Sequence, residues 1–316
     1  MIMPIRLRQI LLAACALSLS MAAHAEDSPL RAVTTFSILG DLVKQVAGDD
    51  AKVDTLTPAG AEVHEWELIP SNFMALEDAD LVFFNGYNLE QWIGQVRATV
   101  GSDVPVIALA EESGYATQPI VTGELAGDPD PHLWMDPRAA AEYVRVIAER
   151  LAEARPAAAE NFTARGDALR QSLHDLHAEL LESMATIPDD RRLLITSEAA
   201  FIYFADAFDF EHDGIWGTNS ENEGTPNQIM RIVDLIETRR PAAIFWESTI
   251  SDRHVRSVAD ETEVDIAGPL FVDSLSEPDG EAPDFASLLR HNARLLTATL
   301  GEPDGASGEP DGTSDH

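Results

Sequence analysis

Strand-like and helix-like segments alternate along most of this chain, in two separate stretches. Short, uninterrupted apolar runs lie between amphipathic segments, first before residue 110 and again after residue 190. An apolar run of this kind, bounded by helices, is typical of a strand in a parallel sheet that is covered on both faces. The sequence therefore predicts an α/β fold with two lobes, each built around a parallel sheet.

The expected elements can be placed by residue number. In the first stretch we expect strands at 31–35, 53–57, 81–85 and 104–108, with helices at 38–47, 72–78 and 90–100. In the second we expect strands at 192–196, 242–246 and 264–267, with helices at 199–208, 226–238, 252–260 and 284–300. These patterns predict two Rossmann-like lobes, at 26–155 and 189–301.

A long helical pattern separates the two stretches. Residues 137–154 are rich in Ala and Arg, and Pro156 is well suited to begin another helix. Apolar residues then recur at steps of three, four and seven: Phe162, Leu169, Leu173, Leu176, Leu180 and Met184. This spacing predicts one amphipathic helix over residues 156–188, about 45 Å long, that joins the lobes as a stiff rod.

Residues 1–25 have the features of an export signal. Two arginines precede an apolar run at 10–23, and Ala23-His24-Ala25 offers small residues for cleavage. Cys15, the only cysteine, is a possible site for a lipid anchor, but only residues 10–14 would then form the apolar core of the signal. We therefore favour a soluble periplasmic protein, cleaved near Ala25, over a lipoprotein anchored at Cys15.

The other end of the chain is acidic, as is the chain as a whole. Residues 302–316 repeat Glu-Pro-Asp-Gly and have no large apolar side chain to bury, which predicts a disordered acidic tail. The full chain has a formal net charge of −34 at pH 7. Because so negative a protein repels phosphate groups, we expect no nucleic-acid partner.

Four residues beside the expected strands and helices form a ligand set for a divalent metal ion: His64, His132, Glu198 and Asp273. Two neutral imidazoles and two carboxylates would balance a 2+ charge in a buried site. Loss of Cys15 with the signal would leave His, Asp and Glu as the strong candidate ligands. Taken singly, His64 could be an ordinary surface residue, and Glu198 could simply interact with a helix dipole.

The remaining histidines give weaker signals. His174 and His177 are three residues apart and could share a helix face, but an exposed pair at this spacing is more often solvated. His212, His254 and His291 stand among charged residues, and we expect them on the surface.

An ordered series of motifs resembles the solute-binding proteins of metal-ion ABC importers. It covers the chain except for its two ends, and it runs through residues 57–67, 79–86, 88–90, 130–137, 196–204, 219–226, 247–248 and 271–274. The resemblance implies two α/β lobes joined by one long helix, with a metal ion in the cleft between them. The family's ligands fall on His64, His132, Glu198 and Asp273.

The third ligand position separates the branches of this family. Zinc members usually have His there, often with a His-rich loop before the second ligand; this chain has Glu198, and residues 111–130 contain no His. It therefore resembles the manganese and iron branch. Zinc favours tetrahedral sites rich in nitrogen or sulfur, whereas two carboxylates can supply more oxygen donors and suit Mn²⁺ or Fe²⁺. We expect Mn²⁺ first, with Fe²⁺ or Zn²⁺ as alternatives.

The resemblance implies a carrier. We expect a monomer that captures the ion, passes it to a permease with its ATPase, and touches the membrane only through that permease. A zinc carrier of the same family is the nearest alternative. A metal-dependent hydrolase or iron oxygenase would need an open coordination position, and the sequence has no His-Glu-x-x-His motif. Nothing in the sequence favours a surface adhesin.

Overall fold

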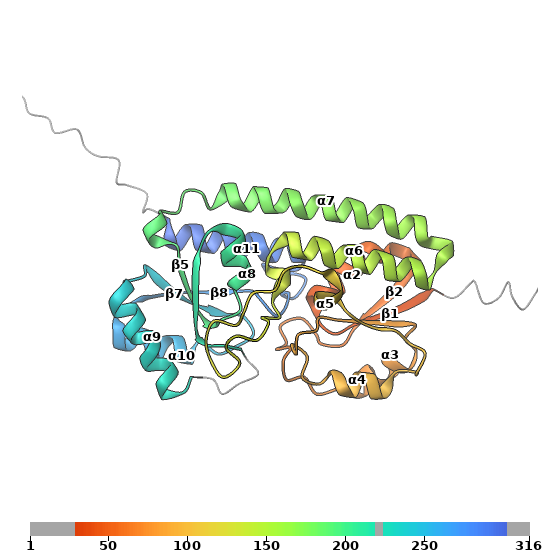
Figure 1. Cartoon of the computed structure of the whole chain (residues 1–316), viewed down its shortest axis with the longest axis horizontal. Helices are drawn as coiled ribbons and strands as arrows, with labels where there is room; N and C mark the ends of the chain where they lie inside the picture. Colours follow the sequence, from red (N-terminus) through yellow and green to blue (C-terminus); the bar gives the residue numbers. More distant parts are fainter. Residues whose placement is uncertain (1–28, 219–223, 302–316) are drawn as a thin grey trace, which may run out of the picture.

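The computed structural model describes residues 29–218 and 224–301 and confirms the expected α/β class. Two lobes lie side by side, and one long helix, α7 (Ala159–Ser183), lies across both (Figure 1). The expected signal (1–25) and acidic tail (302–316), and most of the 219–226 motif, lie outside the described residues. None of the helices in these ranges is both long and apolar enough to cross a membrane.

The N-terminal lobe has a four-stranded parallel sheet in the order β2-β1-β3-β4. The strands are β1 (Leu30–Thr34), β2 (Ala51–Thr55), β3 (Leu81–Phe84) and β4 (Val106–Ala108). The helices are α2 (Ser37–Ala47), α3 (Pro70–Glu77), α4 (Ile93–Thr99), the short α5 (Leu109–Ser113) and α6 (Pro137–Ala154). Ala32 and Val33, neighbours in β1, belong to different apolar clusters, so both faces of this sheet are covered.

The C-terminal lobe has two pairs of parallel strands, β5 with β6 and β7 with β8, and β5 also lies against β7. The strands are β5 (Leu193–Glu198), β6 (Glu211–Trp216), β7 (Ala243–Glu247) and β8 (Asp265–Leu270). The helices are α8 (Ile202–Phe208), α9 (Pro226–Arg239), α10 (Arg253–Thr262) and α11 (Phe285–Leu300). The sequence did not predict β6, whose first half is charged and contains Gly214.

The connecting helix is shorter than the sequence predicted. Pro156–Ala158 forms a 3₁₀ turn, and α7 has 25 residues, which gives about 37 Å rather than 45 Å. The predicted apolar face is correct, because Leu173, Leu176 and Leu180 are buried. One continuous apolar cluster includes residues from α2, α7, α8 and α11, so the two lobes share a core beneath this helix.

Candidate metal centre

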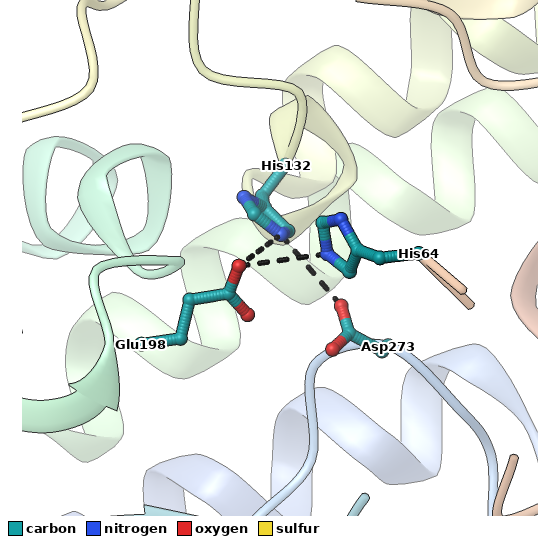
Figure 2. A group of neighbouring side chains, drawn as sticks. All are labelled: His64, His132, Glu198 and Asp273. Carbon is teal, nitrogen blue, oxygen red and sulfur yellow. Dashed lines mark ion pairs between the residues drawn. The ribbon is translucent and has the colours of Figure 1, made fainter. Parts of the chain in front are cut away.

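The four predicted ligands meet between the lobes, although they come from distant parts of the chain (Figure 2). His64 lies in the loop between β2 and α3, and His132 immediately precedes the 3₁₀ turn (Leu133–Met135) that leads into α6. Glu198 is the last residue of β5, and Asp273 follows β8. Parallel sheets commonly place their sites at the carboxyl ends of strands, and this chain follows that rule.

The donor atoms lie close enough together to share one ion. All four side chains are fully buried. Glu198 Oε1 is 3.5 Å from His64 Nε2 and 3.7 Å from His132 Nε2, and the latter is 3.7 Å from Asp273 Oδ1. One donor atom from each residue lies within 4.8 Å of all the others. Ligand atoms lie about 2 Å from a bound ion, so two ligands of one ion are at most about 4 Å apart. The four donor atoms therefore need only small shifts to bind a single metal ion.

The imidazole nitrogens also fit a metal ion. Neither ring nitrogen of His64 has a hydrogen-bond partner, and the same holds for His132 Nε2. A buried polar atom left without a partner destabilises the folded protein, and a bound cation removes that cost. His132 Nδ1 lies 3.0 Å from Asp130 Oδ1, which turns Nε2 toward the centre. Such a carboxylate–histidine pair is typical behind a metal ligand.

Backbone contacts hold the two histidines in place. Asp130 Oδ1 also accepts from the His132 amide at 2.9 Å, and Glu62 Oε1 accepts from the His64 amide at 2.9 Å. The Trp134 indole donates to the Val272 carbonyl at 2.9 Å, while its ring meets the His132 imidazole edge-on. This indole links the His132 segment directly to the segment that bears Asp273.

The two candidate carboxylate ligands have their own supports. Glu247, at the end of β7, accepts a hydrogen bond from the Glu198 amide at 3.1 Å, and the Thr196 hydroxyl donates to the Glu198 carbonyl. Beside Asp273, the Ser274 hydroxyl accepts from the Gly60 amide at 2.8 Å. Gly60 belongs to the loop that bears His64, so this bond joins ligand loops of both lobes.

Burial shapes the protonation of the centre. It raises the pKa of Asp273 to about 7 and that of Glu247 to about 8. Burial and the neighbouring His132 lower the pKa of His64 well below its usual value. Burial also opposes protonation of His132, but the charge and hydrogen bond of Asp130 outweigh it and raise that pKa. Without a cation, the buried carboxyl groups therefore tend to bind protons. A bound dication would instead stabilise their charged, carboxylate form.

The other histidines do not contribute to this centre. Within 29–218 and 224–301, no second group of three or more His, Cys, Asp or Glu residues could hold a metal ion. His174 is exposed, while His177 and His254 are half-buried.

The expectation of a surface position was wrong for His291 and holds only in part for His212, which is half-buried. Burial lowers the pKa of His212 to about 4, and its Nε2 lies 3.2 Å from the Thr196 hydroxyl, because it belongs to the unpredicted strand β6. The His291 side chain is only 11% exposed and lies between Glu281 and the Pro269 carbonyl.

A substitution at Asp130 tests directly whether this residue fixes the orientation of the His132 ring. An Asp130→Ala variant is expected to bind Mn²⁺ about 10- to 100-fold more weakly, because His132 loses the partner that fixes its ring. Asp128→Ala, an exposed position in the same loop, is the matched control and should keep full affinity. Equal affinities of the two variants, measured by calorimetric titration, would show that Asp130 has no such role.

Comparisons with known proteins agree with this geometry. Residues 32–299 match the family described as ZnuA, zinc-uptake complex component A, periplasmic. The iron-binding protein YfeA of Yersinia pestis is 35% identical over 290 residues, 90% of this chain and 92% of that protein. The manganese-binding lipoprotein MntA of Halalkalibacterium halodurans is 35% identical over 273 residues, 86% of this chain and 89% of that protein.

Solved structures give the same result. The Mn-bound periplasmic metal binding protein from Candidatus Liberibacter asiaticus has a TM-score of 0.78 at 27% identity, covering 86% of this chain and 100% of that one. The periplasmic zinc binding protein TroA from Treponema pallidum has a TM-score of 0.80 at 28% identity, covering 87% of this chain and 100% of that one. The predicted resemblance to metal-importer solute-binding proteins is confirmed, and this chain belongs to the ZnuA family.

Proposed function

We propose that this protein captures one Mn²⁺ or Fe²⁺ ion between its lobes and delivers it to an ABC importer permease that works with an ATPase. The observation that supports this most strongly is the convergence of His64, His132, Glu198 and Asp273 in a fully buried centre. Two neutral imidazoles and two carboxylates neutralise a 2+ charge, so the ion would add no net charge to the interior.

The choice of metal rests on the donor set. Relatives of this chain are named for iron and for manganese, and a structural neighbour is named for zinc, so the comparisons leave the metal open. Glu198 and Asp273 can each bind through two oxygens, which allows six donors and favours Mn²⁺ or Fe²⁺. Zn²⁺ is the second candidate, since nitrogen and oxygen sites bind it more tightly than Mn²⁺ when geometry does not discriminate.

Four protein ligands from four segments suit a carrier better than an enzyme. A catalytic metal keeps an open position for water or substrate, whereas these four buried side chains surround the ion. Release then requires the loops that bear the ligands to separate. We further propose that the protein acts outside the cytoplasmic membrane, with residues 1–25 as its export signal.

Metal titration tests the function directly. Purified metal-free protein is expected to bind one Mn²⁺ per chain, followed by loss of the free-Mn²⁺ signal in electron paramagnetic resonance. The titration is repeated in about 1 M salt, where a Debye length of about 3 Å screens weak binding to the acidic surface. Competition with Fe²⁺ and Zn²⁺ then ranks the metals. Several weakly held ions that salt removes, with no tight one, would refute the proposal.

Metal affinity is expected to fall as the pH falls below about 7. Burial raises the pKa of Asp273 to about 7, so in the metal-free protein this group is increasingly protonated below that pH, and the ion must displace the proton. One displaced proton weakens binding about tenfold per pH unit. Titrations across the range from about pH 5.5 to about pH 8.5 measure this slope, and a flat profile would contradict it.

A further inference from the structure

One exposed apolar cluster lies at the start of α3. Ile69, Phe73 and Met74 are three of the six large apolar side chains exposed in the described residues, and they lie within six positions of the chain. Ile69, the N-cap of α3, is four positions from Phe73, and Met74 follows Phe73 directly. We call these three residues the α3 patch. Exposed apolar side chains gathered in one short segment, unlike scattered single residues, are typical of an interaction site.

A second apolar surface lies on α9, in the other lobe, where Met230 is exposed and Ile229 and Val233 are half-buried. Met230 is 58% exposed and forms one wall of a groove of about 560 Å³ between α9 and α10. Ile229 and Val233 also line this groove, and Asp234 and Glu261 lie at its edge. We call Ile229, Met230 and Val233 the α9 patch.

The two patches belong to opposite lobes but to the same side of the molecule. In Figure 1, α3 and α9 both lie on the side that faces away from α7. Four of the six exposed large apolar residues therefore belong to helices on this side, three at the start of α3 and one on α9. A partner that contacts both patches would span the boundary between the lobes, where the metal ligands meet.

The charges around the patches limit what can bind there. The chain has no Lys or Arg between Lys52 and Arg97, and the three glutamates that flank the α3 patch in the sequence, Glu65, Glu67 and Glu77, are exposed.

On α9 the two arginines, Arg231 and Arg239, are paired with Asp213 and Glu211, each at a distance below 3 Å.

A second copy of this chain, with a net charge of −34, would bring two acidic surfaces against each other. An anionic membrane surface would be repelled as well. The surface fits a partner with apolar side chains ringed by Lys or Arg.

We propose that the α3 and α9 patches together form the docking surface for the permease, whose external face offers apolar side chains within a basic rim. This inference rests on the proposed function, since it names the surface that meets the importer. The patches would supply the apolar centre of the interface, and the acidic rims would guide encounter and orientation.

The α3 patch is also connected to a metal ligand. Asn72, in the first turn of α3, accepts hydrogen bonds from the Trp66 indole at 3.2 Å and the Ile69 amide at 3.0 Å. Its side-chain amide donates to the Leu56 carbonyl at 2.9 Å. Asn72 thus ties both ends of the loop that bears His64 to the helix that bears the patch. A partner that shifts α3 would also shift this loop and with it His64. Docking would thereby promote release of the metal ion.

Separating metal binding from metal uptake tests the docking surface. The variants are Phe73→Ser with Met74→Ser, and Met230→Ser; the matched control is Leu181→Ser, which replaces an apolar residue that is 46% exposed on α7. Each variant replaces the wild-type protein in cells that encode no other copy. Uptake of radiolabelled Mn²⁺ is measured in the cells, and Mn²⁺ affinity on the purified proteins.

Patch variants are expected to keep Mn²⁺ affinity within about twofold while uptake falls at least about tenfold, since a few large side chains at the centre of an interface carry most of its binding energy. Leu181→Ser should behave as wild type. Wild-type uptake in both patch variants would overturn the proposal, and so would sedimentation showing a wild-type dimer that the substitutions dissociate. Failure of the proposed function itself looks different, because the wild-type protein would then neither bind Mn²⁺ tightly nor support uptake.

Discussion

A Glu198→Ala variant is expected to bind Mn²⁺ at least about 100-fold more weakly than the wild-type protein. The change removes one of the two carboxylates and leaves His64, His132 and Asp273, so the remaining ligands no longer balance the 2+ charge. Loss of a group behind a ligand already costs about 10- to 100-fold in affinity, and loss of the ligand itself should cost more. Calorimetric titration at neutral pH measures the difference.

Two further variants make this result specific. Glu237→Ala removes an exposed carboxylate from the same lobe and should leave affinity unchanged. Glu198→His supplies a nitrogen in place of the carboxylate and should shift preference from Mn²⁺ toward Zn²⁺, as the ligand preferences of the two ions require. If Glu198→Ala bound Mn²⁺ as tightly as Glu237→Ala, Glu198 would not be a ligand.

Binding of Mn²⁺ is expected to raise the thermal stability of the protein strongly. Metal at about 1,000 times the dissociation constant adds about 4 kcal/mol to the free energy of unfolding, if the unfolded chain does not bind it. For a chain of this size, with an unfolding entropy of about 2.1 cal/mol/K per residue, that corresponds to a rise in Tm of about 6 °C. The stabilisation arises because the ion supplies a partner for buried imidazole nitrogens and joins side chains from four separate segments. Scanning calorimetry with and without Mn²⁺ measures the shift.

The Glu198→Ala variant is the control for this shift, because its site no longer binds tightly. Its Tm should change by less than about 2 °C at the same Mn²⁺ concentration, in keeping with a weaker site. An equal rise in the variant and the wild-type protein would mean that Mn²⁺ stabilises the fold through the acidic surface, not through the centre.

The sequence predicts the lobes well because their signals are local. Apolar runs such as Leu81–Phe84 have the composition of strands in a parallel sheet, and the structure places this run in the N-terminal sheet. The face of α7 is likewise visible in the spacing of Leu173, Leu176 and Leu180, which are buried. Local patterns of this kind follow the regular repeat of a helix or a strand, so the spacing and composition of apolar residues in the sequence are enough to indicate them.

Features that depend on tertiary contacts could not be predicted in the same way. Strand β6 begins with Glu211, His212 and Asp213, which have the composition of a loop, and its strand form follows from pairing with β5. The half-buried position of His212 is a consequence of that pairing. The predicted connecting helix was too long because the pattern does not show where a 3₁₀ turn replaces the first helical turn at Pro156.

The candidate ligands were found through their family motifs, but the roles of their supports were not. Asp130 and Glu247 begin the motifs at 130–137 and 247–248, yet only the folded structure shows them behind His132 and Glu198. Glu247 ends a strand of apolar residues, which is a signal of burial that the sequence does contain. Its contact with Glu198 depends on the packing of β5 against β7 and could not be inferred from the sequence alone.

The most direct measurement is a crystal structure of the Mn²⁺-loaded protein with anomalous data collected at the manganese absorption edge. A single strong peak is expected between the lobes, at bonding distance from one imidazole nitrogen of each histidine and from the oxygens of Glu198 and Asp273. A protein that takes up one Mn²⁺ per chain but shows its peak elsewhere, or with those four side chains turned away from the ion, would contradict the account.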